Sequence, residues 1–221
     1  MKDDFNITQE IIFVDCFNTL IFRKSTDSEI IKAWDMELSQ KFNIPAKKIY
    51  RSYKNINFRL CFSKFFREGA LIESFETVIK KMIMKFQEKY PSLNSDEFKN
   101  FALEIYIKKE SMVHFVKEDF IVFLRKQKEE GKKIFIVSDF YCTSSVISTW
   151  LESLGIDDLF TQVFSSCDYN KEKATGKLYR FLLGELKVNP NNIIMLGDNL
   201  WSDVFMARYN KLKAKCIKGK F

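Results

Sequence analysis

The sequence is poor in the residues that mark tight turns and histidine chemistry. Its 221 residues include three prolines, seven glycines and a single histidine, His114. With 46% hydrophobic and 29% charged residues, this composition argues against a disordered chain and favours a compact, helix-rich protein. One histidine excludes a histidine-based metal centre and gives no support to Ser–His catalysis. We expect His114 to lie at the surface or at a hinge.

The cysteines and the apolar runs exclude further classes. The five cysteines are scattered, odd in number and without a CxxC pair, which excludes a cysteine-rich zinc site and fits a reducing compartment. No apolar run approaches the roughly 20 residues that span a bilayer, and the first ten residues lack the core of a signal peptide. The sequence therefore predicts a cytoplasmic protein with no membrane partner. A bound metal should have oxygen ligands, which points to Mg²⁺.

Positive charge is concentrated in one part of the chain. Residues 22–113 hold 18 Lys and Arg against 12 Asp and Glu, whereas the remaining residues hold 18 against 17. Such a surplus favours an anionic substrate or a nucleic acid, and it is also typical of a solvated, lysine-rich surface. No nucleic-acid-binding motif is present, so a nucleic-acid partner is not expected. The oligomeric state does not follow from the sequence.

Short apolar runs at both ends of the chain predict the strands of a parallel sheet. Helical patterns separate these runs, and strand–helix–strand repetition places helices on both faces of such a sheet. We therefore predict an α/β fold with a Rossmann-like core over residues 1–21 and 114–221. The predicted strands are 11–16, 133–138, a run near 162, 192–197 and 214–217, and the predicted helices are 117–130, 143–154, 176–187 and 200–209.

The stretch 22–113 has no strand-like alternation and predicts a helical cap inserted after the first strand. Its four expected helices lie near 28–42, 46–65, 73–90 and 95–110. Three arginines spaced eight residues apart should share one face of the second helix. A group of phenylalanines on the same helix predicts helix-packing core rather than a ligand box. The arginines are Arg51, Arg59 and Arg67, and the phenylalanines are Phe58, Phe62, Phe65 and Phe66.

Polar residues follow the predicted strands at the edge where parallel sheets bind ligands. Asp15 follows the first strand, Ser138 and Asp139 end the second, and Asp198 follows the fourth. Two acids at one apolar strand exit, as with Asp198 and Asp203, need a partner. The sequence thus predicts a polar site at this edge.

The order of these residues resembles that of the haloacid dehalogenase-like (HAD) superfamily. The family pattern has an Asp after strand one with a Thr four residues later, a Ser or Thr ending strand two, a Lys, and a GDxxxxD motif. Here the pattern is met by Asp15 and Thr19, Ser138, Lys173, and Gly197-Asp198 with Asp203. Tyr179 also stands at the family's spacing after the lysine. The resemblance covers the whole chain, and an inserted helical cap is a known family arrangement.

The resemblance implies an aspartyl-phosphate mechanism. Asp15 would be the nucleophile, and Lys173 together with Mg²⁺ would neutralise the phosphoryl group. The implied metal ligands are Asp15, the backbone carbonyl of Phe17 and Asp198, with Asp203 close behind.

The implied substrate contacts come from the same loops. Ser138 and backbone N–H groups near Asn18 and Thr19 would hold phosphoryl oxygens. Arg23, just after the nucleophile loop, could reach a further anionic group of the substrate. The partner would be a small phosphorylated molecule.

Phe17 departs from the family pattern, because family phosphatases carry there a second Asp that transfers protons. Three readings remain open. Asp139, at the same sheet edge, replaces the missing acid; or the substrate has a good leaving group or is a haloacid; or the chain binds a phosphorylated ligand without turnover. The intact GDNLWSD motif, residues 197–203, argues against dehalogenation, which needs no metal-binding acid pair.

The Asp-x-Phe-x-Thr-Leu motif resembles that of a subgroup often found with enzymes of polysaccharide biosynthesis. This analogy suggests a sugar or polyol phosphate as the substrate.

Overall fold

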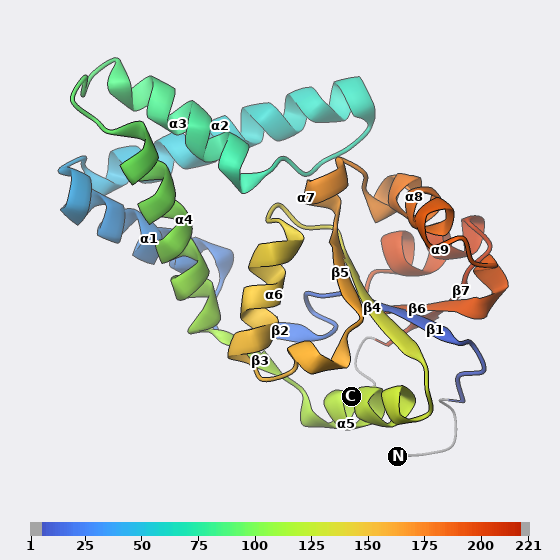
Figure 1. Ribbon diagram of the computed structural model, residues 1–221. Helices are drawn as coiled ribbons and strands as arrows, with labels where there is room; N and C mark the ends of the chain where they lie inside the picture. The colour runs from blue at the N-terminus through green and yellow to red at the C-terminus, as the bar shows by residue number, and fades with distance from the viewer. Residues whose placement is uncertain (1–5, 218–221) are drawn as a thin grey trace. The chain divides into compact units, whose positions relative to one another are not determined.

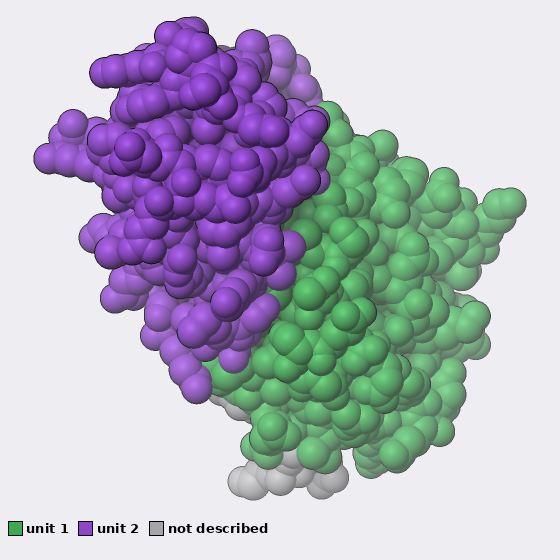
Figure 2. All heavy atoms as spheres, turned by 60° about the vertical axis from the view of Figure 1, so that its left-hand side comes forward, with its two compact units in different colours: residues 1–22, 115–221 green, residues 23–114 purple. Residues whose placement is uncertain are grey.

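The computed structural model describes residues 6–217, which form two compact units. One unit comprises the described residues up to 22 and from 115 onward, and the other comprises residues 23–114; Figure 2 shows them in different colours. We refer to them as the core unit and the helical unit. No helix within the described residues is both long and apolar enough to cross a membrane.

The core unit is built on a five-stranded parallel sheet. Its strand order is β5-β4-β1-β6-β7, so β1 lies at the centre (Figure 1). In the register of the sheet Ile12 of β1 lies opposite Ile134 of β4 and Ile194 of β6. The predicted α/β fold with a Rossmann-like sheet is confirmed. The strands are β1 (Ile11–Val14), β4 (Lys133–Ser138), β5 (Gln162–Ser165), β6 (Ile193–Gly197) and β7 (Lys213–Cys216).

Helices cover both faces of this sheet, which explains why all residues of β1 and β6 are buried. On one face, alternate residues such as Phe13 and Met195 pack in one cluster with Leu178 and Leu182 of α8. Figure 1 shows α8 and α9 on one side of the sheet and α5 and α6 on the other. The helices are α5 (Glu118–Glu129), α6 (Ser144–Ser153), α7 (Ser166–Tyr169), α8 (Lys177–Leu186) and α9 (Met206–Tyr209).

The helical unit contains the four predicted helices. Trp34, fully buried, donates its indole N–H to the Ala102 carbonyl at 2.8 Å and so ties α1 to α4. Thr26 and Glu29 form a capping box at the start of α1, and Asn94 caps α4. The bounds are α1 (Asp27–Phe42), α2 (Ala46–Glu68), α3 (Phe75–Gln87) and α4 (Ser95–Ser111).

Two short strands were not predicted from the sequence. β2 (Ile21–Arg23) and β3 (His114–Val116) pair in a separate two-stranded sheet. Beside them Glu110 of α4 accepts from the Arg23 guanidinium and from His114 Nε2, each at 2.9 Å, and from the Tyr106 hydroxyl. Of the two places expected for His114, the surface is wrong, because its side chain is buried and paired with Glu110; the residue stands at the boundary between the two units.

The phenylalanines of α2 also differ from expectation. Phe58, Phe62, Phe65 and Phe66 are 48–70% exposed, so they are not packing core. Their rings contact one another along the helix instead, edge to face for Phe62 and Phe66, with ring centroids 4.8 Å apart. Helical periodicity placed them on one surface of α2, whereas the buried residues of this helix lie on a different surface. Lys64, near the end of the same helix, is by contrast buried.

Candidate active site

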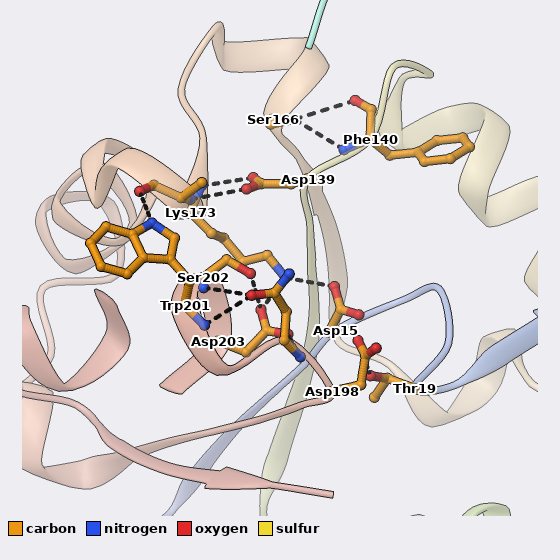
Figure 3. A network of polar contacts seen from close by, with 12 residues as sticks. Asp15, Thr19, Asp139, Phe140, Ser166, Lys173, Asp198, Trp201, Ser202 and Asp203 are labelled. Atoms are coloured by element: carbon orange, nitrogen blue, oxygen red, sulfur yellow. Dashed lines mark hydrogen bonds and ion pairs between the residues drawn. The ribbon is translucent and has the colours of Figure 1, made fainter. Parts of the chain in front are cut away.

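The strand ends of the core unit bring together the acidic residues that the sequence placed at one edge of the sheet. Asp15 directly follows β1, Asp139 follows β4 and Asp198 follows β6. Figure 3 shows the ammonium group of Lys173 linked to Asp15 and Asp203, with Asp198 beside Asp15 and with Asp139 at the backbone of the lysine turn. Parallel strands all end at the same edge, so residues more than a hundred positions apart become neighbours here.

The loop after β1 is a tight turn closed by its own backbone. Asn18 takes a left-handed conformation with φ 59°, and its N–H donates to the Ile21 carbonyl at 2.9 Å. The N–H groups of Leu20 and Ile21 both donate to the Cys16 carbonyl. Asn tolerates this conformation better than most residues, which explains its use at this position. The turn places Thr19 so that its hydroxyl donates to Asp198 Oδ1 at 3.4 Å.

Lys173 is held in place by Asp139. The two carboxylate oxygens of Asp139 accept the backbone N–H groups of Lys173, at 2.7 Å, and of Ala174, at 3.0 Å. These bonds fix a short 3₁₀ turn (Lys173–Thr175) under the sheet edge. From this turn Lys173 Nζ donates to Asp15 Oδ1 at 2.5 Å and to Asp203 Oδ1 at 2.7 Å, with only 1% of the residue exposed.

Asp203 is positioned by a π-helical turn (Leu200–Phe205) that follows β6. Asn199 caps this turn, because its side-chain oxygen accepts the N–H groups of Trp201 and Ser202. The N–H of Asn199 in turn donates to Asp203 Oδ2 at 3.1 Å. Gly197 makes this approach possible, since a Cβ at that position would lie 2.2 Å from Asp203 Oδ2. The glycine of the GDxxxxD motif is therefore required by packing.

Burial and mutual repulsion set the electrostatics of the cluster. Burial raises the pKa of Asp15 to about 7; Lys173 works against this rise, and Asp203 and Asp198 add to it. Burial alone would lower the pKa of Lys173, but Asp15 and Asp203 raise it well above its usual value. Lys173 is thus charged at any physiological pH. Burial also raises the pKa of Asp139 and of Asp198.

The acidic cluster fits a divalent cation bound by oxygen. Asp15, Asp198 and Asp203 each offer a carboxylate oxygen within 4.8 Å of the others, near the roughly 3–4 Å between oxygen ligands of one Mg²⁺ ion. When all three carboxylates are ionised, they exceed the one charge of Lys173 by two negative charges in a largely buried site. A dication would compensate this excess. The predicted participation of the Phe17 carbonyl stays a prediction.

Position 17 belongs to an aromatic cluster. The Phe17 ring stacks on Phe140 with centroids 4.2 Å apart and meets Trp150 edge-on at 5.9 Å. The backbone of Phe140 is held in turn by Ser166, whose hydroxyl accepts the Phe140 N–H at 3.1 Å (Figure 3). The phenyl group of Phe17 therefore packs against the loop after β4, and this ring itself cannot transfer a proton.

Not every predicted site residue joins the cluster. The structure brings together Asp15, Thr19, Lys173, Asp198 and Asp203, while the Asp139 side chain reaches the backbone of the lysine turn. Ser138 is buried at the end of β4, and Asn18 lies within the turn that follows β1. Arg23 lies in the helical unit, where its guanidinium pairs with Glu110 and Asp27.

Several residues that shape the site were missed by sequence reasoning. Asn199 and Ser202 position Asp203, and the Ser202 hydroxyl donates to Asp203 Oδ1 at 3.2 Å. Trp201 donates its indole N–H to the Ala174 carbonyl at 3.0 Å, which ties the π-helical turn to the lysine turn. An Asn before a helical turn is a recognisable N-cap signal and could have been found. The Trp201 contact joins segments that are distant in the sequence, so no local sequence pattern could have predicted it.

The fold and this acidic site define a hydrolase with a Rossmann-like sheet. The chain belongs to the haloacid dehalogenase-like hydrolase family, whose sequence profile matches residues 9–210. Family membership, inferred first from the motif order, is thereby confirmed.

Known proteins are similar to this chain in sequence and in fold. A glyceraldehyde 3-phosphate phosphatase of Pyrococcus furiosus is 31% identical over 101 residues, which are 44% of this chain and only 40% of that relative. A HAD phosphatase from Thermococcus onnurineus has a similar fold, with TM-score 0.58, 21% identity and coverage of 93% of this chain and 84% of that one. A 2-haloacid dehalogenase from Pseudomonas syringae pv. Tomato has TM-score 0.64, 15% identity and coverage of 94% and 85%.

A magnesium-bound relative is also similar in fold. The HAD-hydrolase YfnB from Bacillus subtilis has TM-score 0.55 and 18% identity over 93% of this chain and 85% of that one. At these identities the structural similarity concerns the fold alone.

Proposed function

We propose that this protein is a Mg²⁺-dependent phosphatase that hydrolyses small phosphate monoesters through an aspartyl-phosphate on Asp15. The observation that carries the proposal is the buried Asp15 carboxylate, bridged by Lys173 to Asp203 within a cluster that fits a dication. The phosphatase names of the Pyrococcus furiosus and Thermococcus onnurineus relatives support this substrate class. A sugar or polyol phosphate is the finer proposal, in keeping with the triose phosphate named for the first relative.

Each residue of the site would have its own role in the reaction. A carboxylate oxygen of Asp15 attacks phosphorus, the ester P–O bond breaks, and the leaving oxygen departs with the bonding electrons and takes a proton from solvent; water then attacks the phosphorus, the bond to Asp15 breaks, and inorganic phosphate is released. Lys173 stays charged and stabilises the negative charge beside Asp15 throughout. Mg²⁺, held by Asp15, Asp198 and Asp203, would neutralise the phosphoryl oxygens. Thr19 orients Asp198 through its hydroxyl.

Ser138 and the turn around Asn18 are proposed to bind the phosphoryl group. Ser138 ends the strand next to β1, and the turn follows Asp15 directly, so both belong to the loops at the same sheet edge. We further propose that residues 22–113 serve as a cap over the substrate, as in family members with an inserted helical segment. A direct contact of Arg23 with substrate would require it to leave Glu110 and Asp27, so a role in orienting the strand β2 suits it better.

The source of the proton for the leaving group distinguishes this chain from the family phosphatases that carry an Asp at position 17. Both oxygens of Asp139 accept backbone N–H groups of the lysine turn, which fits a positioning residue better than a general acid. Phe17 cannot transfer a proton. We therefore propose that the leaving oxygen takes its proton from solvent, so that phosphates with stable leaving groups react faster than the proposed sugar or polyol phosphates. The alternative, binding of a phosphorylated ligand without turnover, draws on the same absence of an acid at position 17.

Release of inorganic phosphate from a panel of monoesters, with Mg²⁺ or with EDTA, tests the proposal. Wild-type protein should release phosphate only with Mg²⁺, and Asp15→Asn should abolish the release while the protein stays folded. Asp119→Asn, an exposed acid of the same unit, is the matched control and should leave the rate unchanged. Saturable phosphate-ester binding without any release would instead favour the binding module, and release that survives Asp15→Asn would exclude Asp15 as the nucleophile.

A leaving-group series separates the two roles of Asp139. If Asp139 were the general acid, Asp139→Asn should slow alkyl phosphates by about 10²–10⁴-fold and spare aryl phosphates with stable phenolates. If Asp139 positions Lys173, both substrate classes should slow equally, because every substrate needs the lysine. Phe17→Asp should then speed alkyl phosphates selectively. An unchanged ratio of alkyl to aryl rates in a folded Phe17→Asp variant would show that proton transfer does not limit this enzyme.

A further inference from the structure

A groove at the start of α2 carries positive charge from two helices. Its volume is about 340 Å³, and all of its lining residues belong to the helical unit. Four cations line it and no acidic residue does. The lining consists of Pro45, Lys47, Lys48, Arg51, Ser52, Asn55 and Lys85.

These four cations are not neutralised. Lys41, Lys99 and Lys109 of the same unit each pair with a glutamate, at 2.6–3.1 Å. Within the described residues no carboxylate pairs with Lys47, Lys48, Arg51 or Lys85. Lys48 instead lies over the Tyr90 ring at 4.5 Å, which orients its ammonium without cancelling its charge.

The first turn of α2 has the opposite charge from the one a helix start favours. The N-termini of α1, α3 and α4 each have a side-chain cap and acidic residues in the first turn. The α2 N-terminus follows Pro45, has no side-chain cap and has no acid in its first turn. The N–H groups of Ala46 and Lys47 have no acceptor among the described residues. Free N–H groups and the helix dipole both attract an anion.

A serine of the same helix offers an observation that is independent of the helix end. Ser52 is only 2% exposed, yet it lines the groove, and its Oγ takes part in no hydrogen bond within the described part of the chain. This oxygen is not among the described side-chain atoms that are both shut off from solvent and without a partner, so the small accessible part of Ser52 includes its hydroxyl. Elsewhere in this unit Ser111 bonds the carbonyl four residues before it, a solution also open to Ser52. The Ser52 hydroxyl instead stays free on the side of the groove, where it can bond a ligand.

We propose that this groove binds a phosphate-type dianion, either inorganic phosphate or the phosphate group of a small ester. Lys47, Arg51 and Lys85 would supply the charge, and Ser52 would donate a hydrogen bond to one oxygen. The volume exceeds that of a single phosphate and leaves room for a small organic group. The groove residues belong to the helical unit and the residues of the catalytic cluster to the core unit, and this proposal does not depend on the proposed phosphatase activity.

The test is a titration of the ¹⁵N-labelled full chain with inorganic phosphate at constant ionic strength. The amide signals of Ala46, Lys47 and Ser52 report on the groove, and those of Asn18 and Thr19 report on the active site. The groove signals should shift and saturate. Glycerol 3-phosphate, titrated in the same way, distinguishes the two sources: tighter binding than phosphate assigns the groove to an ester, and equal or weaker binding assigns it to the free ion.

Charge variants separate a built site from general attraction. Arg51→Gln with Lys85→Gln should weaken phosphate binding about tenfold or more, since each charge near 4 Å gives about fivefold even at the dielectric constant of water. The control, Arg59→Gln with Lys81→Gln, removes the same charges from exposed positions of the same two helices and should change the affinity less than about twofold. Ser52→Ala should weaken binding about threefold or more through the lost hydrogen bond.

Three outcomes would overturn the proposal. Groove signals that do not shift with phosphate or the ester exclude the site. If the two double variants weaken phosphate binding equally, the ion is attracted by the general positive charge of the unit and not by a built site. Binding unchanged by Ser52→Ala, as well as by Arg51→Gln with Lys85→Gln, shows that the ion binds elsewhere. Because none of these readouts uses turnover, they do not depend on whether Asp15 is a nucleophile.

Discussion

Replacing Lys173 by Met tests the electrostatics of the acidic site most directly. The Lys173 ammonium lies 2.5 Å from Asp15 Oδ1 and 2.7 Å from Asp203 Oδ1, and the residue is 1% exposed. Methionine keeps an unbranched apolar stem of similar length but removes the charge and its three donors. Without a metal, the three carboxylates of the cluster would then face one another with no opposing charge.

The expected loss of stability depends on pH. Removing one member of a buried ion pair costs about 3–5 kcal/mol, because the remaining charge stays buried. Burial raises the pKa of Asp15 to about 7 from 3.8, so in the metal-free wild type this group's contribution to stability falls as the pH rises between these values. Lys173 limits that rise in pKa, so in Lys173→Met the fall extends to higher pH. The variant should thus lose the full amount at pH 8 and clearly less at pH 5, where Asp15 is protonated in both proteins.

Urea denaturation at pH 5 and pH 8 measures this difference. Metal-free protein should show it fully, and added Mg²⁺ should reduce it at pH 8 by supplying the missing positive charge. The control is Lys177→Met, an exposed lysine four residues along the chain. Turnover of Lys173→Met should fall about 10²–10³-fold, as for the loss of one transition-state donor. A loss of stability that is equal at both pH values, or no larger than the control, would refute the electrostatic account.

Three further predictions concern protons and carboxylates. The affinity for Mg²⁺, measured by calorimetry, should weaken about tenfold per pH unit below 7, because a proton on Asp15 must be released on binding; an affinity that does not change with pH contradicts the assignment of Asp15 as a ligand. At pH 8 Asp198→Ala should weaken Mg²⁺ binding about tenfold or more, since even outer groups of a metal site cost that much. Burial raises the pKa of Asp35 in α1 to about 6, so its contribution to stability falls as the pH rises from 3.8 to 6. Asp35→Asn should therefore stabilise the protein by about 1 kcal/mol at pH 8, after allowance for solvent screening, and by nothing at pH 3; urea curves showing equal effects at both pH values would contradict this.

The sequence by itself determined the fold and the main members of the site. Strand and helix periods differ enough that the five core strands and the helices of both units could be located from their apolar patterns. Asp15, Lys173, Asp198 and Asp203 could be found because each follows a recognisable strand or precedes a helix. Parallel strands share one carboxyl edge, so the order of these residues along the chain already implied that they meet.

Only the tertiary structure decided what each side chain contacts. Periodicity put Phe62 and Phe66 on one surface of α2 but could not show that both side chains are more than half exposed. Arg23 was expected near substrate, and its partner Glu110 lies 87 residues away in the sequence, where no local pattern links them. The sequence offered Asp139 as a candidate acid, and only the structure shows that both of its carboxylate oxygens accept backbone N–H groups of the lysine turn. A hydrogen-bond partner is set by the path of a distant segment, and that path follows from packing of the whole chain rather than from its local sequence.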